Sequence, residues 1–293
     1  MVYNKMDKYF KDITRDILLK GTKDRDPRPK YADGTTAYTK SINHVMMQFD
    51  LANGEFPLLT LRPVSLKSAI GEILWIYRDE SNDLNLLKDK YGITWWDPWD
   101  IGDRTIGSCY GETVRRHNLM KNLLKGLKEN PDSRRHIINL WQENDFKDKH
   151  GLKPCAYQTV WNVRHGSNTF GDDVDYLDMC LFQRSCDWIV AASTTNQVQY
   201  AAFLCMVANH LGYTPGVYTW FGANVHIYDR HESAAIELIY RESVKQETPI
   251  MLVNNNTNRD FYKVNPEDYI IAGGINLSEI KKQNPQIKLE LGI

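Results

Sequence analysis

The feature that most constrains the fold is a long apolar segment, QVQYAAFLCMVANHL (197–211), which predicts a helix ending at Gly212. Segments typical of strands flank it. AYQTVWNV (156–163) and YLDMCLFQ (176–183), with a hairpin-like loop at 165–173 between them, precede it, and VYTWFGANVHIY (217–228) follows it. The apolar segment is shorter than the roughly 20 residues that a membrane-spanning helix needs. We therefore expect a globular protein of the α/β class with no membrane partner.

Further elements follow from apolar periodicity and capping signals. Helical spacing predicts a helix within the first twenty residues, stopped by Gly21, and another over 65–78 with Ser65 as its cap. The remaining expected elements are helices at 119–130 and 231–243, strands at 42–51 and 136–141, and an irregular loop at 21–36. Because no internal repeat or flexible linker interrupts the pattern, we expect residues 1–293 to form a single domain.

Composition excludes several classes of protein. A chain with 42% hydrophobic residues is neither disordered nor of low complexity, and a formal net charge of −1 gives no reason to expect an obligate nucleic-acid partner. The five cysteines include no CxxC pair, which favours reduced thiols over a disulfide framework. The first twenty residues lack the uncharged apolar stretch of a signal peptide. We expect a cytoplasmic protein.

One cysteine has a well-defined setting. Cys155 follows Pro154 at the start of an expected strand, so a rigid turn fixes the position of its thiol. A lone cysteine of this kind is most often a small buried hydrophobic residue. The functional alternative is a thiolate nucleophile, which requires positive charge nearby to lower the pKa of the thiol.

Four arginines could supply that charge or bind a phosphate. Arg28 lies in the early loop, Arg134 and Arg135 lie in the string PDSRR, and Arg184 lies in QRSCD. The planar guanidinium matches two phosphate oxygens at once. Structural ion pairing is an equally open explanation for each arginine taken singly.

Other polar and aromatic residues also have two readings. Glu72 lies on an otherwise apolar helical face and is either at its edge or a buried carboxyl held for proton transfer. His226 and Tyr228 alternate on one strand, so both side chains share a face, where core packing is the simpler explanation. Three tryptophans could form core or an aromatic wall for a planar ligand: Trp95, Trp96 and Trp99.

Taken in order, these strings resemble the thymidylate synthase family. They are PDSRRHI, a Pro-Cys pair beginning a strand, QRSCD, an Asn four residues before Tyr200, and HIY. The resemblance runs from the amino-terminal helix through WWDPW to NPQIKLELGI and covers nearly the whole chain. It implies an α/β (α+β) fold with a mixed β-sheet flanked by helices, and a homodimer formed sheet to sheet.

The resemblance also implies roles for individual residues. Cys155 would attack C6 of the pyrimidine of dUMP and make C5 nucleophilic, while Glu72 would organise proton transfers through water. Tyr110 would help at C5, Asn196 would read the base, and Asp187 would contact the folate and support catalysis. The residues implied to bind the nucleotide are Arg28, Gln183, Arg184, Ser185, Asn196, His226 and Tyr228, with the partner subunit's Arg134 and Arg135. Those implied to bind methylenetetrahydrofolate, the co-substrate, are Trp96, Asp187, Arg62 and Ile293, and no metal is implied.

The base-reading position carries a physical argument for uracil. A side-chain amide can donate to uracil O4 and accept from the N3 hydrogen, whereas cytosine presents the opposite pattern. The alignment counts back from Tyr200 to Asn196, but counting forward from QRSCD gives Thr195 instead.

Departures from the family pattern leave the product open. AASTTN (191–196) replaces the usual Gly-x-Pro-Phe-Asn and is one residue longer, Ala156 stands where many members have His, and Ala223-Asn224 replaces Gly-Asp. Hydroxyl groups in AASTTN could hold a water, as a dUMP or dCMP hydroxymethylase requires. We expect dTMP and dihydrofolate as products. The alternatives are a hydroxymethylase and a nucleotide- or RNA-binding protein on the same scaffold.

Overall fold

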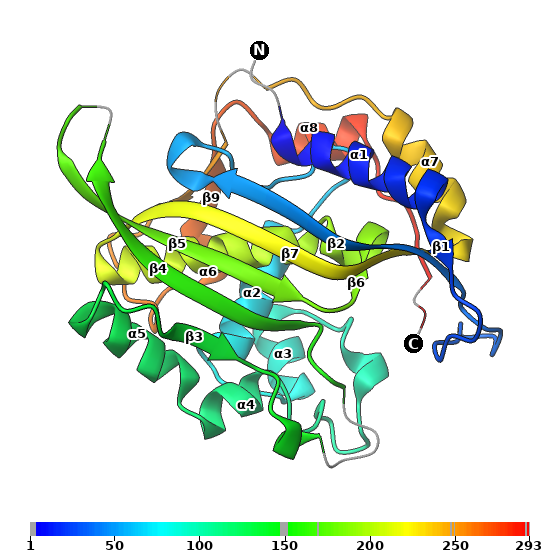
Figure 1. Cartoon of the computed structure of the whole chain (residues 1–293), viewed down its shortest axis with the longest axis horizontal. Helices are drawn as coiled ribbons and strands as arrows, with labels where there is room; N and C mark the ends of the chain where they lie inside the picture. The colour runs from blue at the N-terminus through cyan, green and yellow to red at the C-terminus, as the bar shows by residue number, and fades with distance from the viewer. Residues whose placement is uncertain are drawn as a thin grey trace.

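The computed structural model describes residues 4–146, 152–168, 170–246, 248, 250–290 and 292. The chain contains both helices and strands, with the helices between residues 66 and 129 grouped before the strands between residues 136 and 187 (Figure 1). In chain order the elements are α1 (Lys5–Lys20), β1 (Thr22–Lys23), β2 (Thr39–Asp50), α2 (Leu66–Tyr77), α3 (Leu84–Tyr91), α4 (Gly111–Arg116), α5 (Leu119–Glu129), β3 (His136–Asn139), β4 (Ala156–Ser167), β5 (Asp173–Gln183), β6 (Cys186–Asp187), α6 (Thr195–Leu211), β7 (Thr214–Tyr228), α7 (Glu232–Tyr240), β8 (Met251–Asn254), β9 (Tyr269–Ala272) and α8 (Leu277–Gln283).

A mixed sheet organises the fold, as expected. Its strands follow the order β1-β2-β7-β5-β4-β3, and β6 pairs with β7 beyond the end of β5. β5 and β6 run parallel to β7, and the other pairs are antiparallel. The parallel contacts place the end of β5 beside the middle of β7, up to Gly222, and β6 beside Val225 and His226, so QRSCD lies next to the strand that carries HIY.

The expected helix boundaries are confirmed where capping signals are strong. The side chain of Asn4 accepts a hydrogen bond from the Asp7 backbone at the start of α1, and the helix ends at Gly21. The hydroxyl of Ser65 accepts in the same way from the backbone of Ser68 at the start of α2. Both helices therefore begin where a side-chain acceptor satisfies a free backbone N–H.

The long apolar helix α6 is the centre of the core. It begins two residues before the expected start and lies behind the sheet, against α2 (Figure 1). Phe203 of α6 stacks on Tyr77 of α2 at 4.3 Å between ring centroids, and its edge meets Trp161 of β4 at 5.2 Å. No helix in the described ranges is both long enough and apolar enough to cross a membrane.

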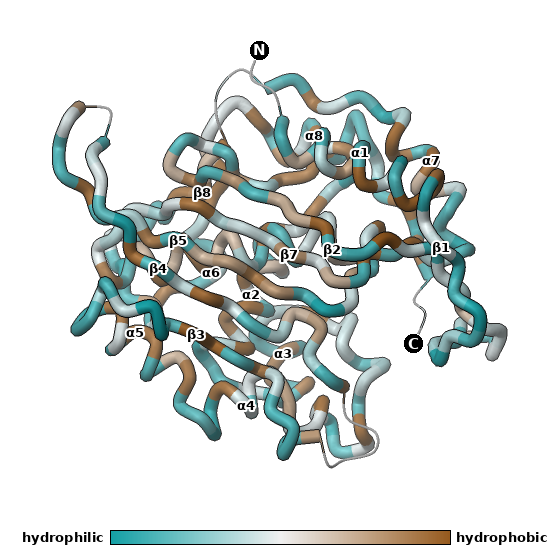
Figure 2. The backbone as a smooth tube through the Cα atoms, in the orientation of Figure 1, coloured by the Kyte–Doolittle hydropathy of each residue, from teal (hydrophilic) through white to brown (hydrophobic). Residues whose placement is uncertain are grey.

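The two faces of the sheet differ in their cover. Alternate residues of β7 such as Tyr218 and Trp220 are buried on the side that faces α6 and α1. The opposite face looks toward the reader in Figure 1, and none of the helices that the structure describes covers its central strands. It nevertheless carries large apolar side chains, among them Met46 (62% exposed) and Ile137 (44% exposed). Figure 2 shows apolar segments along these strands.

Some elements were not expected from the sequence. Helices α3, α4 and α8 and the separate β8-β9 pair are short or lack a long apolar stripe. The expected length of the hairpin loop at 165–173 is also wrong, because β4 and β5 pair out to Ser167 and Asp173. Cross-strand pairing there extends through polar residues that apolar alternation does not mark.

Candidate active site

Most of the predicted site residues line one cavity of about 1220 Å³. This is larger than the roughly 300–1,000 Å³ typical of a pocket for one small ligand, so the cavity has room for two. The predicted residues on its wall are Arg28, Arg62, Glu72, Trp96, Tyr110, Cys155, Gln183, Arg184, Ser185, Asp187, Asn196, His226 and Tyr228. Within the described ranges, no group of His, Cys, Asp or Glu is arranged to hold a metal ion.

Arg184 holds the turn that presents Cys155. Its backbone N–H donates to the Cys155 carbonyl at 2.8 Å, and its guanidinium donates to the carbonyls of Pro154 (2.9 Å) and Lys153 (2.8 Å). The same guanidinium places Nη2 3.8 Å from the Cys155 Sγ. The thiol thus lies beside positive charge, as a thiolate nucleophile would require.

Two effects oppose each other at the thiol. Burial raises the pKa of Cys155, and the positive charges of Arg184 and Arg28 lower it in part. The free protein therefore holds a thiol that is partly buried and close to cations. Such a group becomes more nucleophilic as pH rises or as further positive charge approaches.

Glu72 is a buried carboxyl and does not lie at the exposed edge of its helical face. Only 6% of its surface is exposed, and the Trp95 indole N–H donates to its Oε2 at 2.6 Å. Burial raises the pKa of Glu72, and the Gln199 amide and the Trp95 indole lower it in part. A carboxyl of this kind can hold and release a proton within the cavity.

Tyr110 connects the floor of the cavity to the cysteine turn. Its phenolic oxygen accepts the Cys155 backbone N–H at 2.9 Å, and burial raises its pKa well above the ordinary value. The phenol therefore keeps its own proton, which is free to point into the cavity. Tyr110 has a backbone φ of 50°, a strained conformation for a residue with a side chain.

Asn196 forms hydrogen bonds to two glutamine side chains on the cavity wall. Its Oδ1 accepts from Gln183 Nε2 at 3.1 Å, and its Nδ2 donates to Gln199 Oε1 at 2.9 Å. Thr195 also lines the cavity, but Asn196 is the residue built into this network. The geometry supports the alignment that counts back from Tyr200.

A π-helix absorbs the extra residue of AASTTN. Residues Trp188–Ala192 form this wider turn, and the Asp187 side chain caps it by accepting from the Val190 backbone. The Ser193 hydroxyl donates to the Trp188 carbonyl, and the Thr194 hydroxyl donates to the Val190 carbonyl. The hydrogens of these two hydroxyls are thus used within the turn, while Thr195 lines the cavity.

Asp187 and Arg62 form the opposite end of the cavity. Burial raises the pKa of Asp187 to about 7, although the Val190 N–H and the Arg62 charge both lower it. Arg62 is itself buried, donates to the Ile189 carbonyl at 2.7 Å, and has a pKa lowered by burial to about 10. Asp187 can therefore give or accept a proton near neutral pH.

His226 and Tyr228 share one face of β7, as the alternation predicts. Their rings meet edge to face at 5.4 Å, and the Asn224 side chain contacts His226 Nδ1 at 2.8 Å. Burial lowers the pKa of His226 to about 4, so the ring is neutral at physiological pH. The Tyr228 hydroxyl donates to the Gly292 carbonyl, which brings the carboxyl-terminal segment over the cavity. Ile293 lies outside the described residues.

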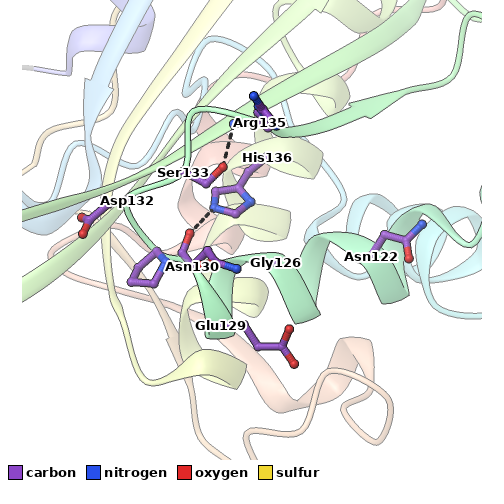
Figure 3. Close-up of a pocket in the computed structure, with 9 residues that line it drawn as sticks. Asn122, Gly126, Glu129, Asn130, Asp132, Ser133, Arg135 and His136 are labelled. Atoms are coloured by element: carbon purple, nitrogen blue, oxygen red, sulfur yellow. Dashed lines mark hydrogen bonds between the residues drawn. The ribbon is translucent and has the colours of Figure 1, made fainter.

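Two predicted phosphate ligands lie elsewhere. Arg134 and Arg135 are exposed in the turn before β3 and do not line the cavity that holds Cys155. Arg135 instead borders a shallow hollow at the end of α5, where its backbone N–H donates to the Ser133 hydroxyl (Figure 3). Within one chain, the cluster of four arginines is incomplete.

Comparisons with known proteins agree with this geometry. The profile of the thymidylate synthase family matches residues 8–285. The chain is 42% identical over 287 residues to a thymidylate synthase of Lactococcus lactis, covering 98% of this chain and 99% of the relative. It belongs to the thymidylate synthase family.

Further relatives extend the comparison. A thymidylate synthase of Streptococcus agalactiae is 40% identical over 290 residues, which cover 99% of both chains. The solved structure of a thermostable thymidylate synthase A from Bacillus subtilis superposes with a TM-score of 0.84 at 33% identity, covering 98% of this chain and 99% of that one. The fold expected from the resemblance to the thymidylate synthase family is thus confirmed.

Residues outside the predicted set also shape the site. Trp95 bonds to Glu72, Gln199 bonds to Asn196, and Lys153 lies at the cavity edge with its ammonium over the Trp141 and Phe146 rings. Gln199 follows Asn196 by three residues, which places both on one side of a helix. That spacing was the one signal in the sequence that could have identified it.

Proposed function

We propose that the protein catalyses reductive methylation of dUMP by methylenetetrahydrofolate, giving dTMP and dihydrofolate, in the cytoplasm. The observation that carries this proposal is the Cys155 thiol held 3.8 Å from Arg184 in a cavity that also contains the buried Glu72. A nucleophile, a cation and a proton-transfer group thus face one volume.

Each residue has a role that its surroundings support. The Cys155 sulfur forms a bond to C6 of the pyrimidine, and the electron pair of the C5–C6 double bond moves toward C5 and O4. Asn196 stabilises charge at O4 through Nδ2, and C5 then bonds to the one-carbon unit. The proton on C5 leaves toward a base assisted by Tyr110, and Glu72 exchanges protons with O4 through water. As C5 bonds to the methylene carbon, the bond from that carbon to one folate nitrogen breaks. Loss of the C5 proton then expels the second folate nitrogen and leaves an exocyclic methylene. Hydride from the tetrahydrofolate adds to this methylene as the Cys155 thiolate departs, which restores the C5–C6 double bond and leaves dihydrofolate.

Folate binding is assigned to the far end of the cavity. Methylenetetrahydrofolate supplies the one-carbon unit and the hydride that completes the methyl group. Asp187, with a pKa near 7, fits a heterocycle that both donates and accepts hydrogen bonds, and Trp96 offers an aromatic wall. Arg62 is positioned by the π-helix carbonyl of Ile189 beside Asp187, where its charge favours an anionic ligand.

Phosphate binding requires two copies of the chain. Arg28, Arg184 and Ser185 line the cavity, and His226 and Tyr228 are placed to hold the deoxyribose hydroxyl. A dianionic phosphate favours more cations than these. We propose a homodimer in which the uncovered sheet face, including Met46 and Ile137, packs on its symmetry mate, and the exposed Arg134 and Arg135 complete the partner's phosphate site.

The geometry favours methylation over hydroxymethylation. The Ser193 and Thr194 hydroxyls bond to carbonyls of the π-helix, which leaves Thr195 as the remaining hydroxyl of AASTTN on the cavity wall. Trp95, Trp96 and Gly292 of the carboxyl-terminal segment line the cavity, and the two indoles add apolar surface to its wall. A water-poor cavity lets hydride reach an exocyclic methylene before water does.

Tritium release tests whether the protein is an enzyme or only a binding protein. With dUMP labelled at C5, methylenetetrahydrofolate and the full chain, we expect tritium to enter water in a time-dependent way. Cys155→Ser is the matched control, because it keeps the cavity and removes the nucleophile. A protein that binds both ligands but leaves the label on C5 would be a nucleotide-binding protein on the same scaffold.

A further inference from the structure

Four side chains on the cavity wall form one continuous chain of hydrogen bonds. The Trp220 indole donates to Gln183 Oε1 at 2.9 Å, Gln183 Nε2 donates to Asn196 Oδ1 at 3.1 Å, and Asn196 Nδ2 donates to Gln199 Oε1 at 2.9 Å. This series of hydrogen bonds starts at Trp220 on β7, passes Gln183 at the end of β5, and ends on α6. Trp220, Gln183 and Gln199 are all buried.

The donors and acceptors in this series of hydrogen bonds follow from the chemistry of the side chains alone. An indole N–H can only donate, so Gln183 must present its oxygen to Trp220 and its Nε2 to the other side. The Ser185 carbonyl, which can only accept, receives the same Nε2 at 3.3 Å and fixes the orientation independently. Asn196 must then accept with Oδ1 and donate with Nδ2. Gln199 must accept with Oε1, which leaves its Nε2 as the donor at the end.

The last donor has been left free next to a carboxyl. Gln199 is 2% exposed, and its Nε2 meets no hydrogen-bond acceptor among the described residues. Gln199 on α6 and the Glu72 carboxyl on α2 line the same cavity, where these two helices pack together. The Gln199 amide lowers the pKa of this buried carboxyl in part. Trp95 donates to Glu72 Oε2, and the Trp96 indole N–H, which likewise has no acceptor among the described residues, also lowers the pKa of Glu72. Two indoles and one amide therefore surround this carboxyl.

A buried donor without a partner lowers the stability of the fold. One explanation for keeping such a donor is that another state of the site uses it. When Glu72 is protonated, its carboxyl has a hydrogen of its own to donate and needs fewer donors from its surroundings than a carboxylate does. When Glu72 ionises during proton transfer, each carboxylate oxygen gains from a donor. The arrangement therefore suits a carboxyl that changes its charge during the reaction.

We propose that Gln199 is a positioning residue that couples base recognition to proton transfer: its oxygen holds the Asn196 amide in the orientation that reads uracil, and its Nε2 holds the ionised Glu72 carboxylate. This inference rests on the proposed roles of Asn196 and Glu72. It assigns Gln199 a part in that function, and it explains why the Asn196 side-chain amide has its orientation.

The experiment compares Gln199→Glu with Gln199→Leu in the full-length protein. While it is protonated, the carboxyl that Gln199→Glu introduces keeps the polarity of the amide, because its carbonyl accepts from Asn196 and its hydroxyl donates toward Glu72. Once ionised, it loses the donor and repels the Glu72 carboxylate. We expect kcat of Gln199→Glu, divided by that of the native protein, to fall up to about tenfold per pH unit as pH rises from 6 to 9.

Gln199→Leu removes both hydrogen bonds without adding charge. We expect its kcat ratio to be low and nearly constant with pH, its KM for dUMP to rise about tenfold, and its preference for dUMP over dCMP to weaken by a similar factor. The matched control is Gln283→Glu, the same change at an exposed position on α8, which should give a ratio near one at every pH.

The outcomes distinguish a failure of the Gln199 proposal from a failure of the proposed function. A flat ratio for a folded Gln199→Glu would overturn the link to Glu72, and an unchanged dUMP KM and dCMP preference in Gln199→Leu would overturn the link to Asn196. If Gln199→Glu does not fold, Gln199→Leu still tests the link to Asn196 through the KM for dUMP and the preference over dCMP. Its kcat, compared with that of the native protein, still shows how much turnover depends on Gln199. A native protein that releases no tritium from dUMP refutes the proposed function itself.

Discussion

Replacing Arg184 with alanine tests the electrostatic setting of Cys155. Arg184 Nη2 lies 3.8 Å from Sγ. At an effective dielectric constant of about 20, two unit charges at this distance attract by roughly 4 kcal/mol, which is an upper limit because water reaches the partly exposed guanidinium. We expect about 1–2 kcal/mol of lost thiolate stabilisation, or roughly a 5–30-fold smaller thiolate population at neutral pH.

The assay is the rate of alkylation by iodoacetamide as a function of pH. A thiolate of higher pKa is also more nucleophilic, with a Brønsted slope of about 0.4–0.5, so the net loss of rate at pH 7 should be roughly 2–6-fold. The midpoint of the pH profile should move to higher pH. The shift has this sign because burial already raises the pKa of Cys155, and removal of a cation raises it further.

Three controls isolate the effect. Cys155→Ser reports alkylation of the other four thiols, of which Cys109, Cys186 and Cys205 are buried. Arg164→Ala removes one positive charge farther along β4, where the arginine pairs with Asp178. Arg184→Lys keeps the charge and loses the bidentate hold on the Lys153 and Pro154 carbonyls. An unchanged midpoint in a folded Arg184→Ala protein would refute the idea that this arginine activates the thiol.

Three further predictions concern groups around the cavity. Because burial lowers the pKa of His226 to about 4, the ring stays neutral above pH 5, so His226→Asn should raise the dUMP KM about tenfold without changing the shape of the kcat profile between pH 6 and 9. Asp187 has a folded pKa of about 7, above its unfolded value, so its stabilising contribution is present below pH 4 and declines as pH rises toward 7. Asp187→Asn should therefore raise Tm relative to the native protein more at pH 8 than at pH 4, and equal Tm differences at both pH values would contradict the burial of the charge. Mixing Arg135→Ala subunits with Cys155→Ala subunits should restore part of the activity if sites share arginines across a two-fold axis, and a verified mixed dimer with no activity would count against the shared site.

Local signals in the sequence predicted much of the fold. Gly21 at the end of α1 and the Ser65 cap of α2 were expected, because both signals depend only on neighbouring residues. The strand at 217–228 and the apolar helix at 197–211 follow from periodicity alone. The π-helix at 188–192 has no such signal, because a one-residue insertion can be absorbed at many points of a turn and tertiary packing selects one.

The site was predictable where one residue type carries one chemistry. Cys155, Arg184 and His226 stood out as candidates by residue type, but only the resemblance to the family implied their roles, and the cavity brings the three side chains together. The roles of Tyr110 and Gln199 depend on partners distant in sequence: Tyr110 accepts from Cys155, 45 residues away, and Gln199 lies beside Glu72 on another helix. Whether Glu72 is buried likewise depends on which helix covers its face, and only the packed fold shows that.

The identity of the products tests the central claim most directly. The native protein is incubated with dUMP and methylenetetrahydrofolate, and the nucleotide and folate products are identified by mass, with Cys155→Ser as the blank. The account predicts thymidylate and dihydrofolate in equal amounts, and no product with the variant. Hydroxymethyl-dUMP with tetrahydrofolate would contradict it, and turnover of dCMP in place of dUMP would also contradict the assignment of Asn196 as the reader of uracil.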